Sequence, residues 1–364
     1  MNRSRVIVLS LAMAFAFLSM PAVGDEAKVR TGDIEGVPYR IQIPSRWNRG
    51  LVMYAHGYKS RGDNWTPLPA VLGAVFLERG FAVAESGYSR QGWAVEEALK
   101  ETEALRQFFA KTYGKPDSTF IAGHSMGGLI TLAAIESHPD AYDGALPLCG
   151  PLVPALAFFK DRVFDMLVTF EALFGDSLPR EYRPVVEAPE LPPQVVERAL
   201  ASRPAAAAEF AEHWDTRPKD LPATVSYYQL MIREIVDRAG GNPIDNRNTV
   251  YCGFEAAPHV NDSVPRYAAV PEALSYLRRY YTPTGVIKDP VLAVHTTYDA
   301  GVPPSFPSSY AVTTALKGNE KLFVQQHVCA DGHCRIDPVS TGRAFDELRK
   351  WAATGAPPEP GPVR

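Results

Sequence analysis

A serine between two glycines is the first feature of this sequence that could do chemistry. Residues 121–129 read IAGHSMGGL, which places Ser125 between Gly123 and Gly127. The apolar run STFIAG precedes this serine and MGGLITLAAIESHP follows it, which predicts a strand, a sharp turn and a helix. Such a turn holds the serine hydroxyl out as a nucleophile. The alternative is a crowded turn in which the serine is simply small.

A serine hydroxyl needs a base within hydrogen-bond reach and a third group that orients the base. In the predicted scaffold these partners follow the serine in the order acid, then histidine. The predicted strand VLAVHTTYD ends at Asp299, and a short loop that contains His333 follows the next predicted strand, KLFVQQHV. Both residues therefore follow strand ends, where open parallel sheets place their sites. We predict Ser125 as nucleophile, His333 as base and Asp299 as its partner.

Other residues compete for the roles of base and acid. His295 lies inside a predicted strand, which favours a place in the core, and His327 lies at a strand end before the loop has turned. Asp331 is too close in sequence to His333 to be preferred as its partner. The remaining histidines flank other motifs or lie outside the expected position: His56, His124, His138, His213 and His259.

A tetrahedral intermediate on the serine would need hydrogen-bond donors for its oxyanion. The residue after the nucleophile, Met126, offers a backbone amide at the start of a helix. The segment HGY follows a short predicted strand at 51–55, where Gly57 allows a close turn and the Tyr58 amide would be the second donor. Each such donor is typically worth about 3 kcal/mol to the transition state. An ordinary turn is the alternative for HGY.

Alternating strands and helices must position these residues. Helical patterns separate most of the predicted strands, which lie at 36–45, 51–55, 81–86, 118–123, 143–150, 290–299 and 321–328. From 151 to 265 the sequence shows helical periods separated by prolines and no convincing buried strand. This predicts an α/β domain, built from residues 25–150 and 266–352, with a mostly parallel sheet covered on both faces and a helical insertion at 151–265.

Aromatic residues near the start of the insertion recur close to the helical period. They are Phe158, Phe159, Phe164, Phe170 and Phe174. One face of this helix would pack on the rest of the protein, and the alternative is that some rings line a substrate pocket. As pocket candidates we take Phe158 and Phe159 from this helix, with His56, Gly57 and His124 from the segments beside the serine.

Composition and the two chain ends limit the class of protein. The 364 residues carry a formal net charge of −4, which gives no basic footprint for nucleic acid. Residues 1–24 combine two arginines, the apolar run VIVLSLAMAFAFL and small residues at a cleavage position, which predicts a signal peptide and a secreted or periplasmic protein. No later apolar run predicts a membrane span in the mature protein. The proline-rich residues 353–364 are predicted to be disordered.

Four cysteines suggest two disulfides in an exported protein. Four cysteines allow three connectivities. We predict Cys149–Cys252, because these two lie near the ends of the insertion, and Cys329–Cys334, because these bracket His333. A zinc site is not expected, since the cluster CADGHC is too tight for tetrahedral ligands. No other metal and no organic cofactor is expected.

The motifs HGY, GHSMGG, YD at 298–299 and GHC at 332–334 resemble those of the α/β-hydrolase family. The resemblance covers about 36–150 and 266–352, and it implies the α/β-hydrolase fold, a Ser-Asp-His triad and a helical cap at 151–265. One detail is similar to the feruloyl esterase and tannase group, in which cysteines adjoining the catalytic serine and histidine form a bridge. Cys334 follows His333, whereas His124 precedes Ser125, so that bridge cannot form here.

We predict a secreted serine hydrolase that cleaves small-molecule carboxylic esters through an acyl-enzyme. The first alternative is an aminopeptidase-like enzyme of the same fold, which would need a carboxylate in the cap to bind a free N-terminus. Glu171, Glu181 and Glu187 are present there, and nothing in the sequence singles one out. The second alternative is a binding protein that has kept the fold and lost turnover, against which the complete candidate triad argues.

Overall fold

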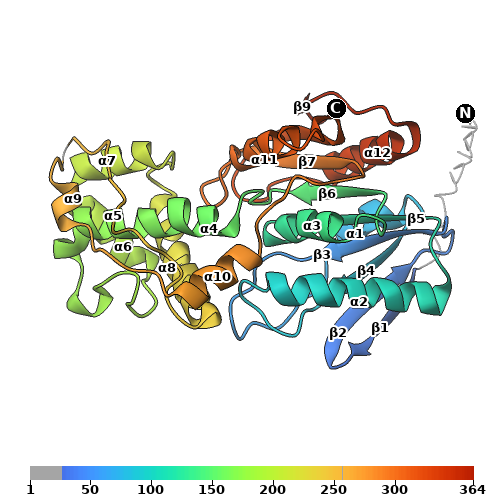
Figure 1. Cartoon of the computed structure of the whole chain (residues 1–364), viewed down its shortest axis with the longest axis horizontal. Helices are drawn as coiled ribbons and strands as arrows, with labels where there is room; N and C mark the ends of the chain where they lie inside the picture. The colour runs from blue at the N-terminus through green and yellow to red at the C-terminus, as the bar shows by residue number, and fades with distance from the viewer. Residues whose placement is uncertain (1–26, 256) are drawn as a thin grey trace, which may run out of the picture.

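The computed structural model describes residues 27–255 and 257–364 and centres on a nine-stranded sheet (Figure 1). The strand order is β1-β2-β4-β3-β5-β6-β7-β8-β9. The pairs β1–β2 and β2–β4 are antiparallel, and all other neighbours are parallel. The prediction of an α/β fold with a mostly parallel sheet is confirmed. The strands are β1 (Lys28–Ile34), β2 (Val37–Ile43), β3 (Gly50–Ala55), β4 (Ala82–Ser86), β5 (Ser118–His124), β6 (Gly144–Leu148), β7 (Val291–Tyr298), β8 (Phe323–Asp331) and β9 (Gly361–Pro362).

Helices cover both faces of the sheet. Side chains alternate along a strand, so Leu51 and Met53 of β3 join one apolar cluster while Val52 and Tyr54 join the other. The first face is covered by α2 (Val95–Tyr113), α3 (Met126–Ser137) and α11 (Phe306–Ala315), and the second by α1 (Ala70–Leu77) and α12 (Pro338–Thr354). Because both faces are covered, every residue of β3 is buried, which explains its continuous apolar sequence.

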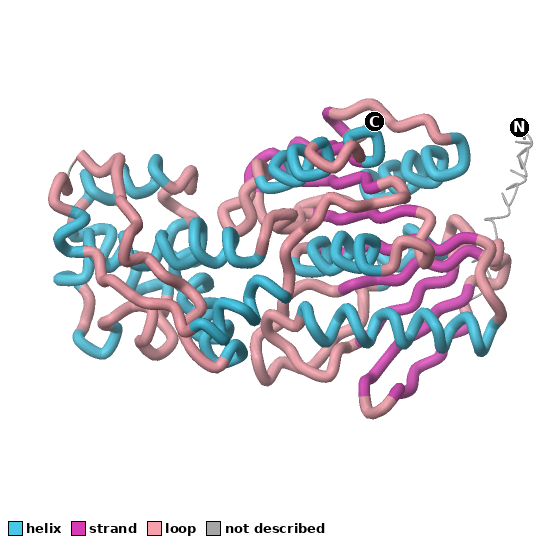
Figure 2. Tube along the Cα trace, viewed as in Figure 1, coloured by secondary structure: helices cyan, strands magenta, loops and turns pink. Residues whose placement is uncertain are grey.

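Helices and loops fill the described chain between β6 and β7 (Figure 2). We call residues 151–265 the cap. The cap stands beyond the ends of β5 and β6, on the side where Ser125 follows β5 (Figure 1). Its helices are α4 (Ala155–Ala157), the π-helix η1 (Phe158–Phe164), α5 (Asp165–Phe174), the short 3-10 turns η2 (Gly175–Ser177) and η3 (Arg180–Tyr182), α6 (Pro193–Ser202), α7 (Pro204–His213), α8 (Leu221–Ala239) and α9 (Val260–Ser263). The chain returns to the sheet through α10 (Pro271–Arg279), and the 3-10 turn η4 (Glu320–Leu322) precedes β8.

The prediction that residues 353–364 are disordered is wrong. Instead of being disordered, residues 353–364 continue α12 as far as Thr354 and then form β9. Strand β9 pairs in parallel with β8, and the amide of Val363 donates to the carbonyl of His327 at 3.0 Å. A proline is compatible with this position because β9 is an edge strand, where one side of the backbone needs no partner. The tail therefore covers an edge of the sheet that β8 would otherwise expose.

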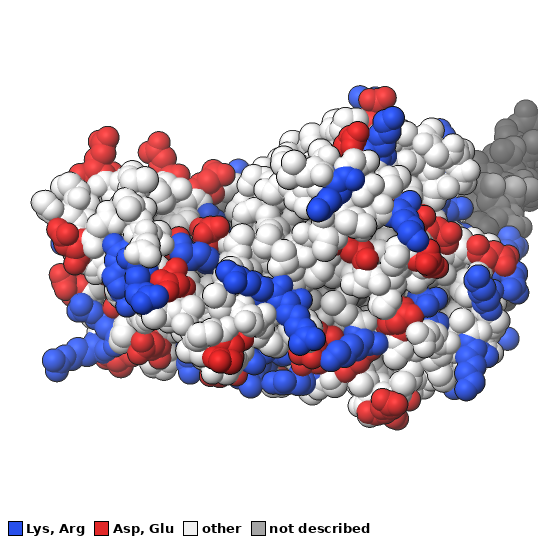
Figure 3. Space-filling model, in the orientation of Figure 1, with Lys and Arg blue, Asp and Glu red and all other residues white. Residues whose placement is uncertain are grey.

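Charged residues of both signs are interspersed on the face of the molecule shown in Figure 3, over the cap as well as the sheet domain. This face therefore presents no large field of a single sign. The predicted signal peptide, residues 1–24, lies outside the described residues. Among residues 27–255 and 257–364, none of the helices combines the length and the apolar content that a membrane crossing requires.

Candidate active site

Ser125 occupies the sharp turn between β5 and α3. Its backbone angles are φ 59° and ψ −127°, a conformation that residues other than glycine rarely adopt. The flanking glycines make the turn compatible with close packing. A Cβ added at Gly123 would lie 2.4 Å from the carbonyl oxygen of Gly127, and one added at Gly127 would lie 2.1 Å from that of Ala55. The glycine spacing in the sequence thus reflects the close approach of α3 to β3 and β5.

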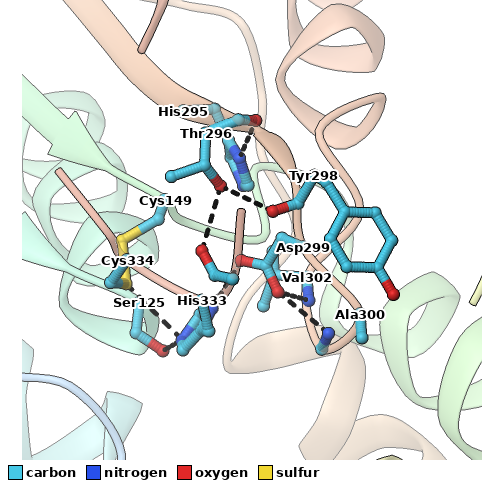
Figure 4. A network of polar contacts seen from close by, with 12 residues as sticks. Ser125, Cys149, His295, Thr296, Tyr298, Asp299, Ala300, Val302, His333 and Cys334 are labelled. Carbon is cyan, nitrogen blue, oxygen red and sulfur yellow. Dashed lines mark hydrogen bonds and ion pairs between the residues drawn. A yellow bond between two sulfur atoms is a disulfide. The ribbon is translucent and has the colours of Figure 1, made fainter. Parts of the chain in front are cut away.

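A continuous hydrogen-bond chain joins Ser125, His333 and Asp299 (Figure 4). The Ser125 Oγ lies 2.7 Å from Nε2 of His333, and Nδ1 of the same ring lies 2.6 Å from Oδ2 of Asp299. The Asp299 side chain is fully buried, whereas that of His333 is 40% exposed. An imidazole held in this way can take the serine proton, because the carboxylate fixes its tautomer and stabilises the cation that forms.

The environment of Asp299 keeps its carboxyl group ionised. Burial favours the neutral form, but the hydrogen bond and charge of His333 and the amide of Val302 outweigh burial, so the pKa of Asp299 lies below its ordinary value. The second carboxylate oxygen, Oδ1, accepts from the amides of Gly301 and Val302 at 2.9 and 3.0 Å. These bonds aim the other oxygen at the imidazole.

Strands β7 and β8 bring the acid and the base together. Their pairing is irregular between Thr296 and Tyr298, and Tyr298 then pairs with Asp331. The amide of Gly332 donates to the carbonyl of Tyr298 at 2.9 Å, and the Thr296 hydroxyl donates to the Gly332 carbonyl at 3.3 Å. The loops that carry Asp299 and His333 therefore leave the sheet side by side. Strand β8 ends at Asp331, three residues beyond the end predicted at residue 328.

The two predicted oxyanion donors lie beside the serine. A Cβ at Gly57 would be 3.2 Å from Cβ of Ser125, so the turn at 56–58 lies directly against the nucleophile position. Tyr58 and Met126 line the same cavity as Ser125 and His333. Among the described residues, neither of these two backbone amides has an acceptor in the protein. Both amides are therefore available to a ligand.

A cavity of about 310 Å³ opens onto Ser125 between the sheet domain and the cap. Its wall is mainly apolar and aromatic, and includes Tyr58, Trp93, Met126, Pro151, Phe158, Tyr227, Met231 and Val302. Its other side carries polar groups, namely Arg217, Lys219, Asp220, Tyr298 and Asp331. The cavity can thus hold an apolar group next to the hydroxyl of Ser125. Trp93, Tyr227 and Met231 were missed in the sequence, because they come from distant segments with no common spacing.

The pocket candidates divide into two groups. Phe158 lines the cavity. Phe159 instead is fully buried, with its ring centroid 4.9 Å from that of Trp93. His56 lies behind the serine turn and stacks on Tyr88 at 3.9 Å between ring centroids. Similarly, Nδ1 of His124 forms a hydrogen bond with the Tyr54 hydroxyl at 2.9 Å. Neither histidine is among the residues that line the cavity, and neither is Gly57, so these predicted pocket residues are wrong.

The cysteines pair differently from the prediction. A single bridge joins Cys149 to Cys334, with 5.3 Å between their Cα atoms, while Cys252 and Cys329 are free and exposed. Cys149 directly follows β6 and lies beside the loop of Cys334, because β6, β7 and β8 are neighbours in the sheet. Cys329 is held within β8, so it does not bracket a loop with Cys334. Cys252 lies in the cap between α8 and α9.

Solved structures identify the fold. An esterase from Aspergillus oryzae matches with a TM-score of 0.51 and 12% identity, over 92% of this chain and 80% of its own. An acylaminoacyl peptidase, solved in complex with Z-Gly-Gly-Phe-chloromethyl ketone, matches with a TM-score of 0.50 and 11% identity, over 90% of this chain. The chain has the α/β-hydrolase fold. It spans only 42% of the peptidase.

One protein-family model matches part of the chain. Residues 79–220 match the family described as "Putative esterase", a segment that contains Ser125 and most of the cap but neither Asp299 nor His333. No curated protein matches the sequence. The predicted α/β-hydrolase fold is confirmed by the solved structures, and residues 79–220 are similar to an esterase family. The partial resemblance to feruloyl esterases and tannases stays a prediction. Cys334 pairs with Cys149, which is not next to the serine in the sequence.

Removing the bridge should slow this hydrolase without unfolding it. The amide of Ser125 donates to the carbonyl of Leu148, next to Cys149, and Cys334 follows His333. The bridge therefore holds the loop of His333 close to the serine turn. We expect Cys149→Ala/Cys334→Ala to label with a fluorophosphonate roughly 10- to 100-fold more slowly, since a displacement of about 1 Å can cost that much. The control is Cys252→Ala/Cys329→Ala, which should label at the normal rate. Equal rates in both double variants would contradict this role of the bridge.

The stability of the hydrolase should fall in mild acid. Burial lowers the pKa of His56 and of His124 to about 4. An unfolded histidine has a pKa of about 6.5, so below that pH the unfolded chain binds protons that the native chain does not. Each residue should therefore remove up to about 1.4 kcal/mol of unfolding free energy per pH unit between pH 6.5 and 4.

Urea unfolding at several pH values measures this loss of stability. The variant His124→Gln should show a shallower pH dependence, because one of the histidines whose pKa burial lowers is gone. The exposed His259, with an 86% exposed side chain, supplies the control His259→Gln, which should follow the wild type. An unfolding free energy that stays constant from pH 7 to 4 would contradict the burial of neutral histidines under the serine turn.

Proposed function

We propose that this α/β hydrolase cleaves carboxylic esters through an acyl-enzyme on Ser125. The observation that carries the proposal is the unbroken chain of hydrogen bonds, 2.7 and 2.6 Å long, from the serine through His333 to Asp299 at the wall of a cavity. Ser125 attacks the ester carbonyl while Nε2 of His333 takes its proton. The imidazolium, paired with Asp299, then gives that proton to the leaving alcohol. Water resolves the acyl-enzyme by the same steps.

The amides of Tyr58 and Met126 are the proposed oxyanion hole. Support comes from their position in the cavity wall next to the serine and from their lack of a protein acceptor among the described residues. As the carbonyl carbon becomes tetrahedral, its oxygen gains charge that two fixed amides stabilise without reorganisation. The amide of Met126 also lies at the N-terminus of α3, where the helix dipole favours an anion.

Ester hydrolysis is favoured over an aminopeptidase activity by the cavity wall. An aminopeptidase needs a carboxylate near the nucleophile to hold a free N-terminus. None of Glu171, Glu181 and Glu187 is among the residues that line the cavity. Two other carboxylates do line it, but both already have partners: Asp220 accepts from the Tyr298 hydroxyl at 2.8 Å, and Asp331 pairs with Arg217. Glu171 is also committed elsewhere, since it accepts from the amide of Val185 at 2.8 Å. The largely apolar wall fits the acyl or alcohol group of an ester better than a charged terminus.

Two measurements test the proposed function. The first is labelling by a fluorophosphonate probe, which should modify Ser125 and no other serine. The second compares p-nitrophenyl esters of increasing chain length and aryl esters with aminoacyl p-nitroanilides. Turnover of the esters alone would support the proposal, whereas faster turnover of the anilides would favour the peptidase. An unlabelled Ser125 without any turnover would favour a binding protein.

We also propose that the enzyme is exported to the periplasm or secreted. The charge and apolar pattern of residues 1–24 supports this, and the Cys149–Cys334 bridge is of the kind that persists in oxidising compartments. Determination of the N-terminus of the protein recovered from its host tests this proposal. A chain that retains residues 1–24 and remains with the cytoplasmic fraction would overturn it.

A further inference from the structure

A buried arginine of the cap contacts the turn that carries Asp299. Arg162 belongs to η1 and is only 6% exposed. Its Nη2 donates to the carbonyl of Ala300, the residue after Asp299, at 2.7 Å. The other guanidinium bonds go to the carbonyl of Trp214, the hydroxyl of Thr216 and the hydroxyl of Tyr228. Within residues 27–255 and 257–364, no carboxylate forms an ion pair with Arg162.

A buried guanidinium without a carboxylate partner is costly in free energy unless neutral acceptors satisfy it. In this enzyme the acceptors come from two bodies, since Trp214, Thr216 and Tyr228 belong to the cap while Ala300 belongs to the sheet domain. The guanidinium therefore joins the cap to the turn after β7 through strong, charge-assisted hydrogen bonds.

Tyr228 of α8 adds a contact to the next residue of the same turn, Gly301. Its hydroxyl accepts from Nε of Arg162 at 3.0 Å and donates to the carbonyl of Gly301 at 2.7 Å. The same turn is held from inside by Asp299, whose Oδ1 accepts from the amides of Gly301 and Val302. Side chains of the cap thus bind the carbonyls of Ala300 and Gly301. The carboxylate of Asp299 binds amides of the same turn.

A second link from the cap to the strands that lead to Asp299 and His333 lies at the surface and is weaker. Arg217 pairs with Asp331, and its guanidinium lies 3.9 Å from the ring centroid of Tyr298. The side chains of this pair are 42% and 59% exposed, and exposed pairs contribute little. The buried link through Arg162 and Tyr228 is therefore the one that can fix the position of the acid.

We infer that Arg162 and Tyr228 are positioning residues for Asp299, which they hold in register with Nδ1 of His333 through the carbonyls of Ala300 and Gly301. The inference rests on the proposed function, because the register of the acid matters to rate only if His333 is the base. Its consequence is that the catalytic acid is set only when the cap is docked. Loosening the turn should lower kcat more than it raises KM, because neither residue lines the cavity.

The test is a double-mutant cycle built on Tyr228→Phe, which removes a single oxygen atom. We expect a kcat on p-nitrophenyl esters about 10-fold below wild type with KM nearly unchanged. In the Asp299→Asn background Tyr228→Phe should cost nothing further, because the group that it positions is already lost. Arg162→Met should lower kcat by about 100-fold, with partial recovery in Arg162→Lys.

The matched control is Tyr251→Phe, another tyrosine of the cap, whose hydroxyl donates to Asp165 and contacts no part of the turn. It should leave kcat unchanged. An undiminished effect of Tyr228→Phe in the Asp299→Asn background, or an equal loss in Tyr251→Phe, would overturn the inference, since both would indicate a general effect of cap stability. If wild-type Ser125 were neither labelled nor active on esters, the proposed function would itself fail.

Discussion

Ser125→Ala should lower kcat by about 10⁶-fold and leave the fold unchanged, as expected for removal of a nucleophile that works as a unit with its base. In the proposed mechanism the hydroxyl oxygen bonds to the acyl group, whereas the turn depends on glycines at 123 and 127 rather than on this oxygen. Initial rates on an activated ester, together with thermal unfolding, measure the two expectations. Activity close to that of the wild type would remove Ser125 from the mechanism.

The base can be checked in the same assay. His333→Ala should be comparably severe, because among residues 27–255 and 257–364 the Ser125 hydroxyl has no hydrogen-bond partner besides Nε2 of His333. The control is His327→Ala, which removes a histidine six residues earlier within β8. A larger loss in His327→Ala than in His333→Ala would mean that the base is wrongly placed.

Asp299→Asn should lower kcat by about 10⁴-fold, since an amide in place of the carboxylate holds the imidazole in the wrong tautomer. The side chain of Asp299 is fully buried and its Oδ1 is bound by two amides, so the asparagine should keep the position of the turn. The measurement is kcat on the same ester with the enzyme at known active-site concentration.

Asp331→Asn is the matched control for the acid. Asp331 lies two residues before His333, but its carboxylate contacts Arg217 at the surface. We expect less than a 10-fold change, because an exposed ion pair is typically worth about 1 kcal/mol or less. A loss in Asp331→Asn as large as that in Asp299→Asn would indicate that the acid has been misassigned.

Much of the site could be predicted from short stretches of the sequence. The glycines around Ser125 and the apolar runs that end at Asp299 and before His333 are short-range signals, and the structure brings these three residues together. The same signals also located the turn at 56–58 beside the serine. Residues of this kind are placed by strand ends, and strand ends can be read from alternation and turn residues.

Features that depend on which segments become neighbours could not be read in this way. The pairing of Cys149 with Cys334 requires that β6, β7 and β8 lie side by side, and no local pattern states the order of strands. The bond from Arg162 to Ala300 spans 138 residues. The pairing of β9 with β8 depends on a free edge that exists only in the assembled sheet.

The bridge between Cys149 and Cys334 also changes what a protease can do to this protein. The two cysteines are 185 residues apart, and the chain between them includes the whole cap and both strands that lead to Asp299 and His333. A single cut anywhere in the cap would leave one fragment with Ser125 and another with the acid and the base. The bridge would keep these fragments covalently joined, so a nicked molecule could retain its complete set of site residues until a reductant separates the two halves.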